Sequence, residues 1–188
     1  MNDIKSVLER LQKEVGLAFF GITDSKTNKF IDKILNANHV FVAGKGRSDL
    51  IAQCFAMRLM QLGIPTYHIG DCTTPSITKG DLLIAISGSG KTQTIKIIME
   101  EAKKAGGRVV LLTCKKSKKE LAMLKGIDQI IEINAKTKQD INSKISIAPL
   151  GTLFEEASFL YLDAVVVLIM EKQHIQECML GKRHSNLE

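Results

Sequence analysis

The chain has 188 residues, of which 45% are hydrophobic, 24% charged and 5% aromatic, and it contains no tryptophan. This length suits one globular domain, and the composition excludes a disordered or collagen-like chain. Lys and Arg number 26 against 20 Asp and Glu, a formal net charge of +6 that suits an anionic partner. The charges are scattered apart from the cluster at 115–119, so we expect no nucleic-acid groove.

The first part of the chain predicts two helices, a strand and a third helix. Apolar residues recur at helical spacing at 4–11 and again at 31–35. Residues 39–43 are typical of a short buried strand, which ends in a glycine-rich turn at 44–48. A helix is then predicted over 50–62. The order is strand, glycine turn, helix.

Strands and helices alternate through the middle of the chain. We predict strands at 66–69, 82–86, 109–113 and 129–133, and helices at 94–105 and 119–124. Such alternation requires right-handed crossovers and places helices on both faces of a parallel sheet. A core of aliphatic side chains with few aromatic ones favours the same architecture. The predicted fold class is therefore α/β, with a five-stranded parallel sheet in a three-layer arrangement.

The last part of the chain predicts a loop followed by helices. Residues 134–148 are polar and irregular, and we expect a mobile loop there. A long helix is predicted over 152–173; its apolar stretch is interrupted by Asp163 and is too short to span a bilayer. We expect a single domain over 1–188, with N-terminal helices at about 1–37, a sheet core at about 38–134 and C-terminal helices at about 152–188.

The spacing of the four cysteines favours a reducing compartment. Cys54, Cys72, Cys114 and Cys178 are far apart and form no Cys-x-x-Cys pair, so we expect neither a metal site nor a disulfide framework. The first 14 residues carry charges and lack the apolar run of a secretory signal. A cytoplasmic protein with reduced thiols and no membrane partner is expected.

The segment Ser87-Gly88-Ser89-Gly90-Lys91-Thr92 follows a predicted strand and precedes a helix. In an open parallel sheet, ligands bind beyond the carboxyl ends of the strands. Five of these six residues are Gly, Ser or Thr, which offer hydroxyl donors and free backbone N–H groups at a helix start. The alternative is a tight turn without a ligand, but this density of donors favours an anion site.

Two nucleotide-binding motifs are matched only in part. The tripeptide at 90–92 agrees with the end of a Walker A loop, but Ala85 stands where that pattern requires glycine, and the strand at 109–113 lacks a terminal Asp for magnesium. A dinucleotide fingerprint beginning at Gly44 has Asp49 in place of its third glycine. We expect neither activity.

Glu155 and His184 are candidate catalytic residues, but each can also be explained without a catalytic role. Thr152 and Glu155 fit a capping box at the start of the long helix, whereas catalysis would place Glu155 as a base beside a carbonyl-bearing substrate. His184 lies near the C-terminus, where a lone histidine is usually a solvated tail residue. The residues alone leave both pairs of interpretations open.

Six short motifs occur in order along the chain: GRS at 46–48, FAMRLM at 55–60, TP at 74–75, SGSG at 87–90, GTLFE at 151–155 and HSNL at 184–187. Taken together, they resemble the 6-phospho-3-hexuloisomerase family of the sugar isomerase (SIS) domain superfamily. The resemblance runs from about Val40 to the C-terminus.

This resemblance implies a flavodoxin-like sheet, no metal, no organic cofactor and a homotetramer. It also implies interconversion of D-arabino-hex-3-ulose 6-phosphate and fructose 6-phosphate through an enediol, with Glu155 as the proton acceptor. We expect His184 to complete the active site of a neighbouring subunit. The expected phosphosugar-binding residues are Gly46, Arg47, Ser48, Ser87, Gly88, Ser89, Gly90, Lys91 and Thr92.

The chain departs from the family pattern at three positions. Gln61 stands where family members typically carry His, Asp71 where Glu is usual, and Lys91 where Glu or Arg is common. No role of the family histidine is therefore carried over to Gln61. Two alternatives stay open: an isomerase of a related phosphosugar such as arabinose 5-phosphate, and a non-catalytic SIS module that senses a sugar phosphate. The sequence also leaves open whether the reaction serves formaldehyde fixation by the ribulose monophosphate pathway or pentose-phosphate supply.

Overall fold

The computed structural model describes residues 3–114, 117, 120, 124, 126–140 and 143–187. Five strands form one sheet in the order β2-β1-β3-β4-β5, and every neighbouring pair is parallel. The strands are β1 (Val40–Ala43), β2 (Thr66–His68), β3 (Leu82–Ile86), β4 (Arg108–Cys114) and β5 (Gln129–Ile133). This is the flavodoxin-like strand order. It confirms the predicted α/β fold class.

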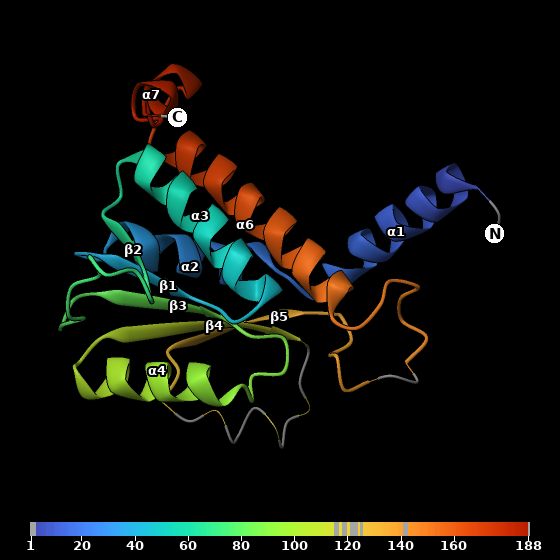
Figure 1. Ribbon diagram of the computed structural model, residues 1–188. Helices are drawn as coiled ribbons and strands as arrows, with labels where there is room; N and C mark the ends of the chain where they lie inside the picture. The colour runs from blue at the N-terminus through green and yellow to red at the C-terminus, as the bar shows by residue number, and fades with distance from the viewer. Residues whose placement is uncertain are drawn as a thin grey trace.

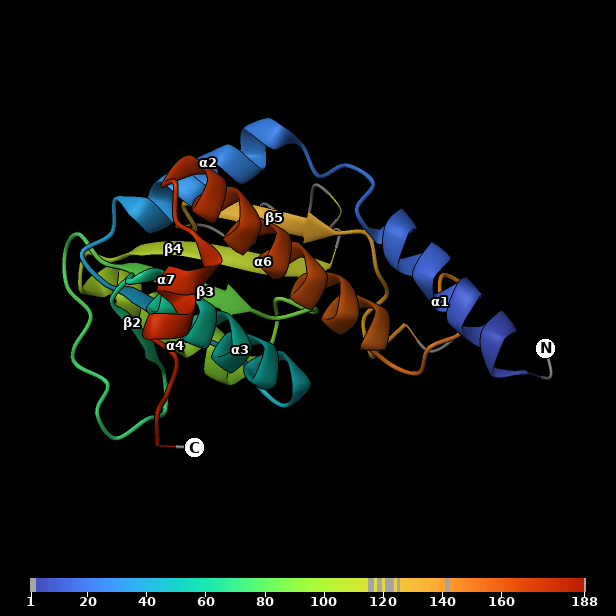
Figure 2. The same cartoon turned by 90° about the horizontal axis from the view of Figure 1, so that it is seen from above.

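Helices cover both faces of the sheet (Figure 1). They are α1 (Ile4–Ala18), α2 (Asp24–Leu35), α3 (Arg47–Leu62), α4 (Gln93–Lys104), α6 (Thr152–Lys172) and α7 (Glu177–Lys182). Helix α4 lies on one face, and α2, α3 and α6 lie on the other. Seen from above, α3 and α6 cross the sheet side by side, while α1 extends beyond the ends of the strands (Figure 2). Most of the helix predicted over 119–124 lies outside the described residues.

The strands contribute side chains to two apolar layers, one on each face of the sheet, because successive side chains point to opposite faces. In β1, Val40 and Val42 pack with α2, α3 and α6, whereas Phe41 and Ala43 pack with α4. All four side chains are buried. Burial on both faces explains why these strands read as continuous apolar runs rather than as alternating ones. In the described part of the chain, no helix is long and apolar enough to cross a membrane.

The loop after β5 is anchored to α1 by a buried carboxylate. Glu14 is 8% exposed, and its side chain accepts hydrogen bonds from Ser146 Oγ (2.6 Å) and from the backbone N–H of Ile147 (3.1 Å). Arg10 Nε donates to the same carboxylate at 3.1 Å. At its other end, the loop is held by a hydrogen bond from Asn134 N–H to the carbonyl of Ala18. The segment is therefore irregular but attached at both ends.

We expect Glu14→Gln to lower the free energy of unfolding by about 1.5–3 kcal/mol, the usual worth of hydrogen bonds to a charged group. Burial opposes the charge of Glu14, but the hydrogen bonds from Ser146, Ile147 and Arg10 outweigh it and lower the pKa of this carboxyl. A carboxylate with a lowered pKa stabilises the fold above its unfolded pKa, and this stabilisation is lost as pH falls through the folded pKa. The difference between wild type and variant should therefore shrink in acid.

Chemical denaturation at neutral and acid pH measures this difference. Glu9→Gln on the exposed side of α1 is the matched control, and it should cost little at either pH. Equal stability of the Glu14 and Glu9 variants at neutral pH would show that the anchor contributes nothing.

Candidate active site

A cavity of about 390 Å³ lies beyond the carboxyl ends of β1 and β3. Strand β1 leads into α3 on one face, and β3 leads into α4 on the other, so the cavity lies where the direction of winding changes. Doubly wound sheets bind their ligands at this switch point. The cavity is lined by the turns after β1 and β3, by the loop after β5 and by the start of α6. Its volume falls within the roughly 300–1,000 Å³ typical of small-molecule sites.

Three helices begin at this cavity without a side-chain cap. Their N-cap residues are Gly46 for α3, Thr92 for α4 and Gly151 for α6, and none of the three makes a capping hydrogen bond through a side chain. Helices α1 and α2, which begin elsewhere, are capped by Asp3 and Thr23. Uncapped starts leave backbone N–H groups and the positive ends of the helix dipoles directed at one space. An anion bound there would satisfy them.

The turn after β3 brings hydroxyl groups to the cavity. Ser87 Oγ and Thr92 Oγ1 lie 3.2 Å apart, and Ser89 Oγ accepts a hydrogen bond from the N–H of Lys91 at 3.1 Å. Gly88 packs against α6, where a Cβ would lie 3.1 Å from the ring of Phe154. A side chain at this position would therefore push the turn and the start of α6 apart.

The turn after β1 requires glycine because the backbone closes on itself. A Cβ on Gly44 would lie 2.5 Å from the backbone of Ser48 and Asp49. The N–H of Gly44 donates to Asp49 Oδ1 at 3.2 Å, and Gly46 has a φ of +63°. This closed turn places Ser48, which is buried, and Arg47, which is exposed, on the cavity wall.

Glu155 faces the cavity from the first turn of α6 and forms an ion pair with Nε of Arg47. Its side chain is 17% exposed. The capping box considered from the sequence does not form, because Gly151 is the N-cap and no side chain caps this helix. The carboxylate is therefore available to a ligand, and Arg47 and the dipole of α6 stabilise its charge.

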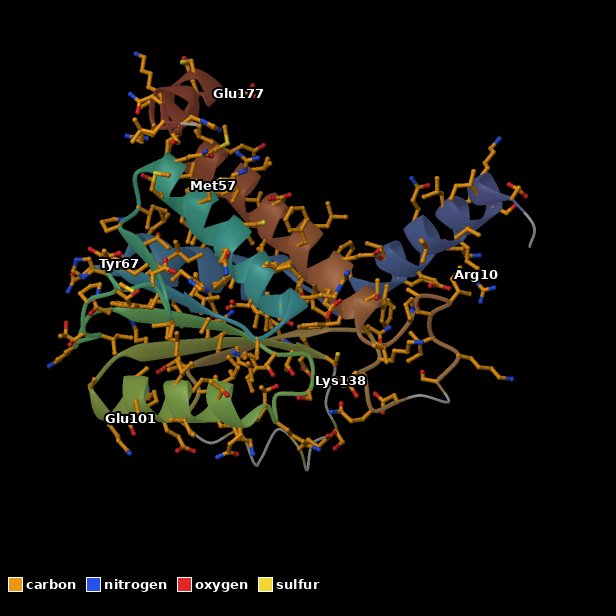
Figure 3. The ribbon with its side chains drawn as sticks, viewed as in Figure 1. Arg10, Met57, Tyr67, Glu101, Lys138 and Glu177 are labelled. Atoms are coloured by element: carbon orange, nitrogen blue, oxygen red, sulfur yellow. The ribbon has the colours of Figure 1, made fainter. Side chains whose placement is uncertain are left out.

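The loop after β5 contributes residues that the sequence analysis did not single out. Lys136, Thr137, Lys138 and Gln139 line the cavity. Lys136 is 9% exposed, and its Nζ donates to the carbonyl of Ser146 at 3.1 Å. Figure 3 shows Lys138 beyond the ends of the strands, on the side where α3 and α6 begin. The position of this loop after a parallel strand was the available signal, since such loops meet at one edge of the sheet.

The charge lining the cavity is predominantly positive. Its described lining holds four cations, Lys45, Arg47, Lys136 and Lys138, and the single acid Glu155. Together with the three helix starts, these cations favour a ligand with more than one negative charge, such as a phosphate monoester. The carboxylate gives the same cavity one proton acceptor.

Four residues discussed from the sequence lie elsewhere. Gly90 and Lys91 belong to the β3 turn but do not line the cavity, and Lys91 Nζ lies 3.2 Å from Glu120 Oε1. Gln61 is buried near the end of α3, where it accepts from Arg58 and its carbonyl accepts from Arg183. His184 follows α7 and is exposed.

Helix α6 separates His184 from the cavity of its own chain. This helix has 21 residues and spans about 30 Å. Figure 3 shows Glu177, the first residue of α7, at the opposite end of α6 from Lys138. Within one chain, the structure therefore does not bring His184 to the cavity of Glu155.

Fold and site together define a doubly wound α/β domain with a predominantly cationic cavity at its switch point. The chain belongs to the SIS domain family, whose model matches residues 33–150. A 3-hexulose-6-phosphate isomerase from Methanocaldococcus jannaschii is 37% identical over 163 residues, which cover 87% of this chain and 84% of the relative. An enzyme of the same name from Bacillus subtilis is 36% identical, covering 89% of each chain.

A solved structure supports the same relationship. The crystal structure of a Methanococcus jannaschii protein, from which a 3-hexulose-6-phosphate isomerase function was inferred, matches with a TM-score of 0.82 at 36% identity. The match covers 96% of this chain and 98% of that one. The resemblance drawn from the motifs is thereby confirmed.

Proposed function

We propose that this protein is an isomerase that interconverts D-arabino-hex-3-ulose 6-phosphate and D-fructose 6-phosphate. The observation that carries the proposal is one carboxylate, Glu155, at the edge of a cavity otherwise built for an anion. The names of the M. jannaschii and B. subtilis relatives support this choice of substrate. A sensor of sugar phosphates needs the anion site but has no use for the carboxylate.

The phosphate binds at the turn after β3. Hydroxyl groups of Ser87, Ser89 and Thr92 and backbone N–H groups of the turn, where Gly88 allows close approach, donate to its oxygens. Gly90 supplies the φ of +61° that the turn needs. Ser48, Gly46 and Arg47 bind the sugar from the turn after β1, and the lysines of the cavity balance the remaining charge. Lys91 contributes indirectly: its N–H donates to Ser89 Oγ and so orients that hydroxyl, while its side chain points to Glu120.

The reaction moves the carbonyl between C3 and C2 by proton transfers. Glu155 takes the proton from C2 of the 3-ketose, and the electron pair of that C–H bond forms the C2–C3 double bond while O3 gains a proton. The enediol then loses the proton of O2, a carbonyl forms at C2, and Glu155 returns its proton to C3. Arg47, paired with Glu155, supplies positive charge where the oxygens become negative.

We expect Ser89→Ala to weaken binding of substrate and product because a donor to the phosphate is lost. A hydrogen bond to a charged group contributes about 1.5–3 kcal/mol, which corresponds to a rise in KM and in the dissociation constant of fructose 6-phosphate of about 10- to 150-fold. Steady-state kinetics and titration calorimetry measure both. Ser25→Ala, at an exposed position on α2, is the control. Unchanged KM and product affinity would remove Ser89 from the phosphate site.

We also propose that the protein is a homotetramer. Between its charged ends, α6 carries a single charged residue, Asp163, and its apolar side chains lie on more than one face: Phe159, Leu160, Val167 and Leu168 are 40–53% exposed. Exposed apolar patches of this kind mark contact surfaces. Figure 3 shows Met57, which is 42% exposed, on the neighbouring helix α3. Assembly through this surface is the route by which His184 of one chain reaches the cavity of another.

Domain organisation and location are further parts of the proposal. We infer that the flanking helices belong to the same SIS domain as the segment 33–150, because α1, α2 and α6 share one apolar cluster with the sheet. A cytoplasmic location is supported by Cys54, Cys72 and Cys178, which are exposed yet form no disulfide.

A coupled assay tests the proposed activity. The purified protein is supplied with formaldehyde, ribulose 5-phosphate and a hexulose phosphate synthase, and fructose 6-phosphate is measured. We expect rapid formation of fructose 6-phosphate and no turnover of arabinose 5-phosphate. Turnover of arabinose 5-phosphate alone would identify the related isomerase. Tight binding of fructose 6-phosphate without any turnover would identify a sensor.

A further inference from the structure

A histidine held between two carboxylates lies behind the turn after β1. His68 is the last residue of β2, and its side chain is 12% exposed. Its Nε2 lies 3.0 Å from Asp49 Oδ1, and its Nδ1 lies 3.0 Å from Asp71 Oδ1. None of these three side chains has a part in the reaction described above, and His68 does not line the cavity.

This arrangement requires the protonated imidazole. A neutral ring has one N–H and can donate to one carboxylate, whereas the imidazolium donates from both nitrogens. Burial opposes the charge, but the hydrogen bonds and charges of Asp49 and Asp71 outweigh it and raise the pKa of His68. The charged groups that face His68 are Asp49 from α3 and Asp71 from the loop after β2. The neighbouring Tyr67 packs against His39 and Phe41 with the apolar layer on the α4 side of the sheet.

Asp49 connects this histidine to the cavity wall. The same Oδ1 atom that faces His68 accepts a hydrogen bond from the N–H of Gly44, the first residue of the turn. Asp49 directly follows Ser48, and Gln53 Nε2 donates to its other oxygen at 3.2 Å. Because a Cβ at Gly44 would collide with the backbone at Ser48 and Asp49, the turn has no slack. A shift of Asp49 therefore moves the residues before it.

We propose that His68 is a positioning residue, whose imidazolium clamps Asp49 against Asp71 and thereby holds the β1 turn in the form that presents Ser48 and Arg47 to the substrate. The inference rests on the proposed function, in which this turn binds the sugar. Deprotonation of His68 removes one of the two N–H donors, so one of the two carboxylates loses its hydrogen bond from the ring. The turn then loosens, and affinity for the phosphosugar falls with rising pH.

The test compares two histidine variants over the pH range in which histidine titrates. The dissociation constant of fructose 6-phosphate, KM and kcat are measured for wild type, His68→Gln and His39→Gln. His39 is the matched control, since its Nδ1 lies 3.0 Å from Asp81 Oδ1 at the opposite end of β1 from the turn. Ionisation of the phosphate itself affects all three proteins equally, so the ratio of each variant to wild type isolates the histidine.

We expect His68→Gln to raise the dissociation constant and KM by about 3- to 10-fold at acid pH, and by progressively less as wild type loses its own proton. His39→Gln should follow wild type throughout. Asp71→Asn removes one of the two carboxylates, lowers the pKa of His68, and should move the loss of affinity to lower pH. If the dissociation constant and KM of His68→Gln equal those of wild type at every pH, the inference is overturned.

Amide hydrogen exchange of residues 44–48 measures, without substrate, how firmly His68 holds the β1 turn. At equal pH, these amides should exchange faster in His68→Gln than in wild type, and at the wild-type rate in His39→Gln. If wild type neither binds nor converts fructose 6-phosphate, the proposed function fails, and the exchange result still decides whether His68 holds the turn. Unchanged exchange in both His68→Gln and Asp71→Asn overturns the clamp.

Discussion

Replacement of Glu155 by Gln should lower kcat by about 10²-fold or more, while fructose 6-phosphate still binds. Glutamine keeps the shape of the side chain but cannot accept the proton from carbon. Because no side chain caps α6, the variant loses no helix cap, and the thermal midpoint should change little. Steady-state kinetics, titration calorimetry and a thermal melt together separate these effects.

The control for this experiment is the neighbouring acid. Glu156→Gln alters the same turn of α6 and the same charge, but Glu156 does not line the cavity. It should keep near wild-type turnover. A Glu155→Gln protein that remains active but melts at a lower temperature would show that Glu155 is structural, with its role limited to the ion pair with Arg47.

His184→Ala should be nearly inactive by itself, and activity should return when it is refolded together with Glu155→Gln. The enediol step needs a group that carries a proton between the two oxygens, and an imidazole can accept a proton at one nitrogen and donate one from the other. Since α6 separates His184 from its own cavity, we propose that His184 reaches the cavity of a neighbouring subunit. In randomly mixed oligomers, about a quarter of the sites combine an intact Glu155 with an intact His184, so about a quarter of wild-type activity is expected.

Formation of mixed oligomers has to be demonstrated, for example with two tags of different mass. Mixed oligomers as inactive as either parent would contradict a site shared between chains. Full activity of His184→Ala alone would remove the histidine from the mechanism. Refolding of each variant with wild-type chains is the control for losses during the procedure.

Most of the fold follows from local pattern, because the apolar runs that form β1 to β5 alternate with helices and glycine turns. The turn at 87–92 could likewise be predicted as a candidate anion site from local sequence, since its donors are adjacent in the chain. The capping box of Thr152 and Glu155 illustrates the opposite case. Its residues have the correct spacing, yet Glu155 pairs with Arg47, more than 100 positions away.

Features assembled by the tertiary structure could not be predicted. Lys136 and Lys138 belong to no motif, and the sheet alone brings their loop to the cavity. The convergence of three uncapped helix starts depends on how α3, α4 and α6 are placed. The proposed clamp joins His68 to Asp49, which precedes β2 in the sequence, and to Asp71, which follows it. The spacing of His68 from either aspartate corresponds to no known motif.

Equilibration of fructose 6-phosphate with the protein in deuterated water, followed by NMR, tests the central claim most directly. An enediol between C2 and C3 predicts signals of the 3-ketose and incorporation of deuterium at C3, with no exchange at C1. Wild type should show this exchange, and Glu155→Gln should lack it. Exchange at C1 with formation of an aldose phosphate, or the absence of any reaction in wild type, would contradict the account.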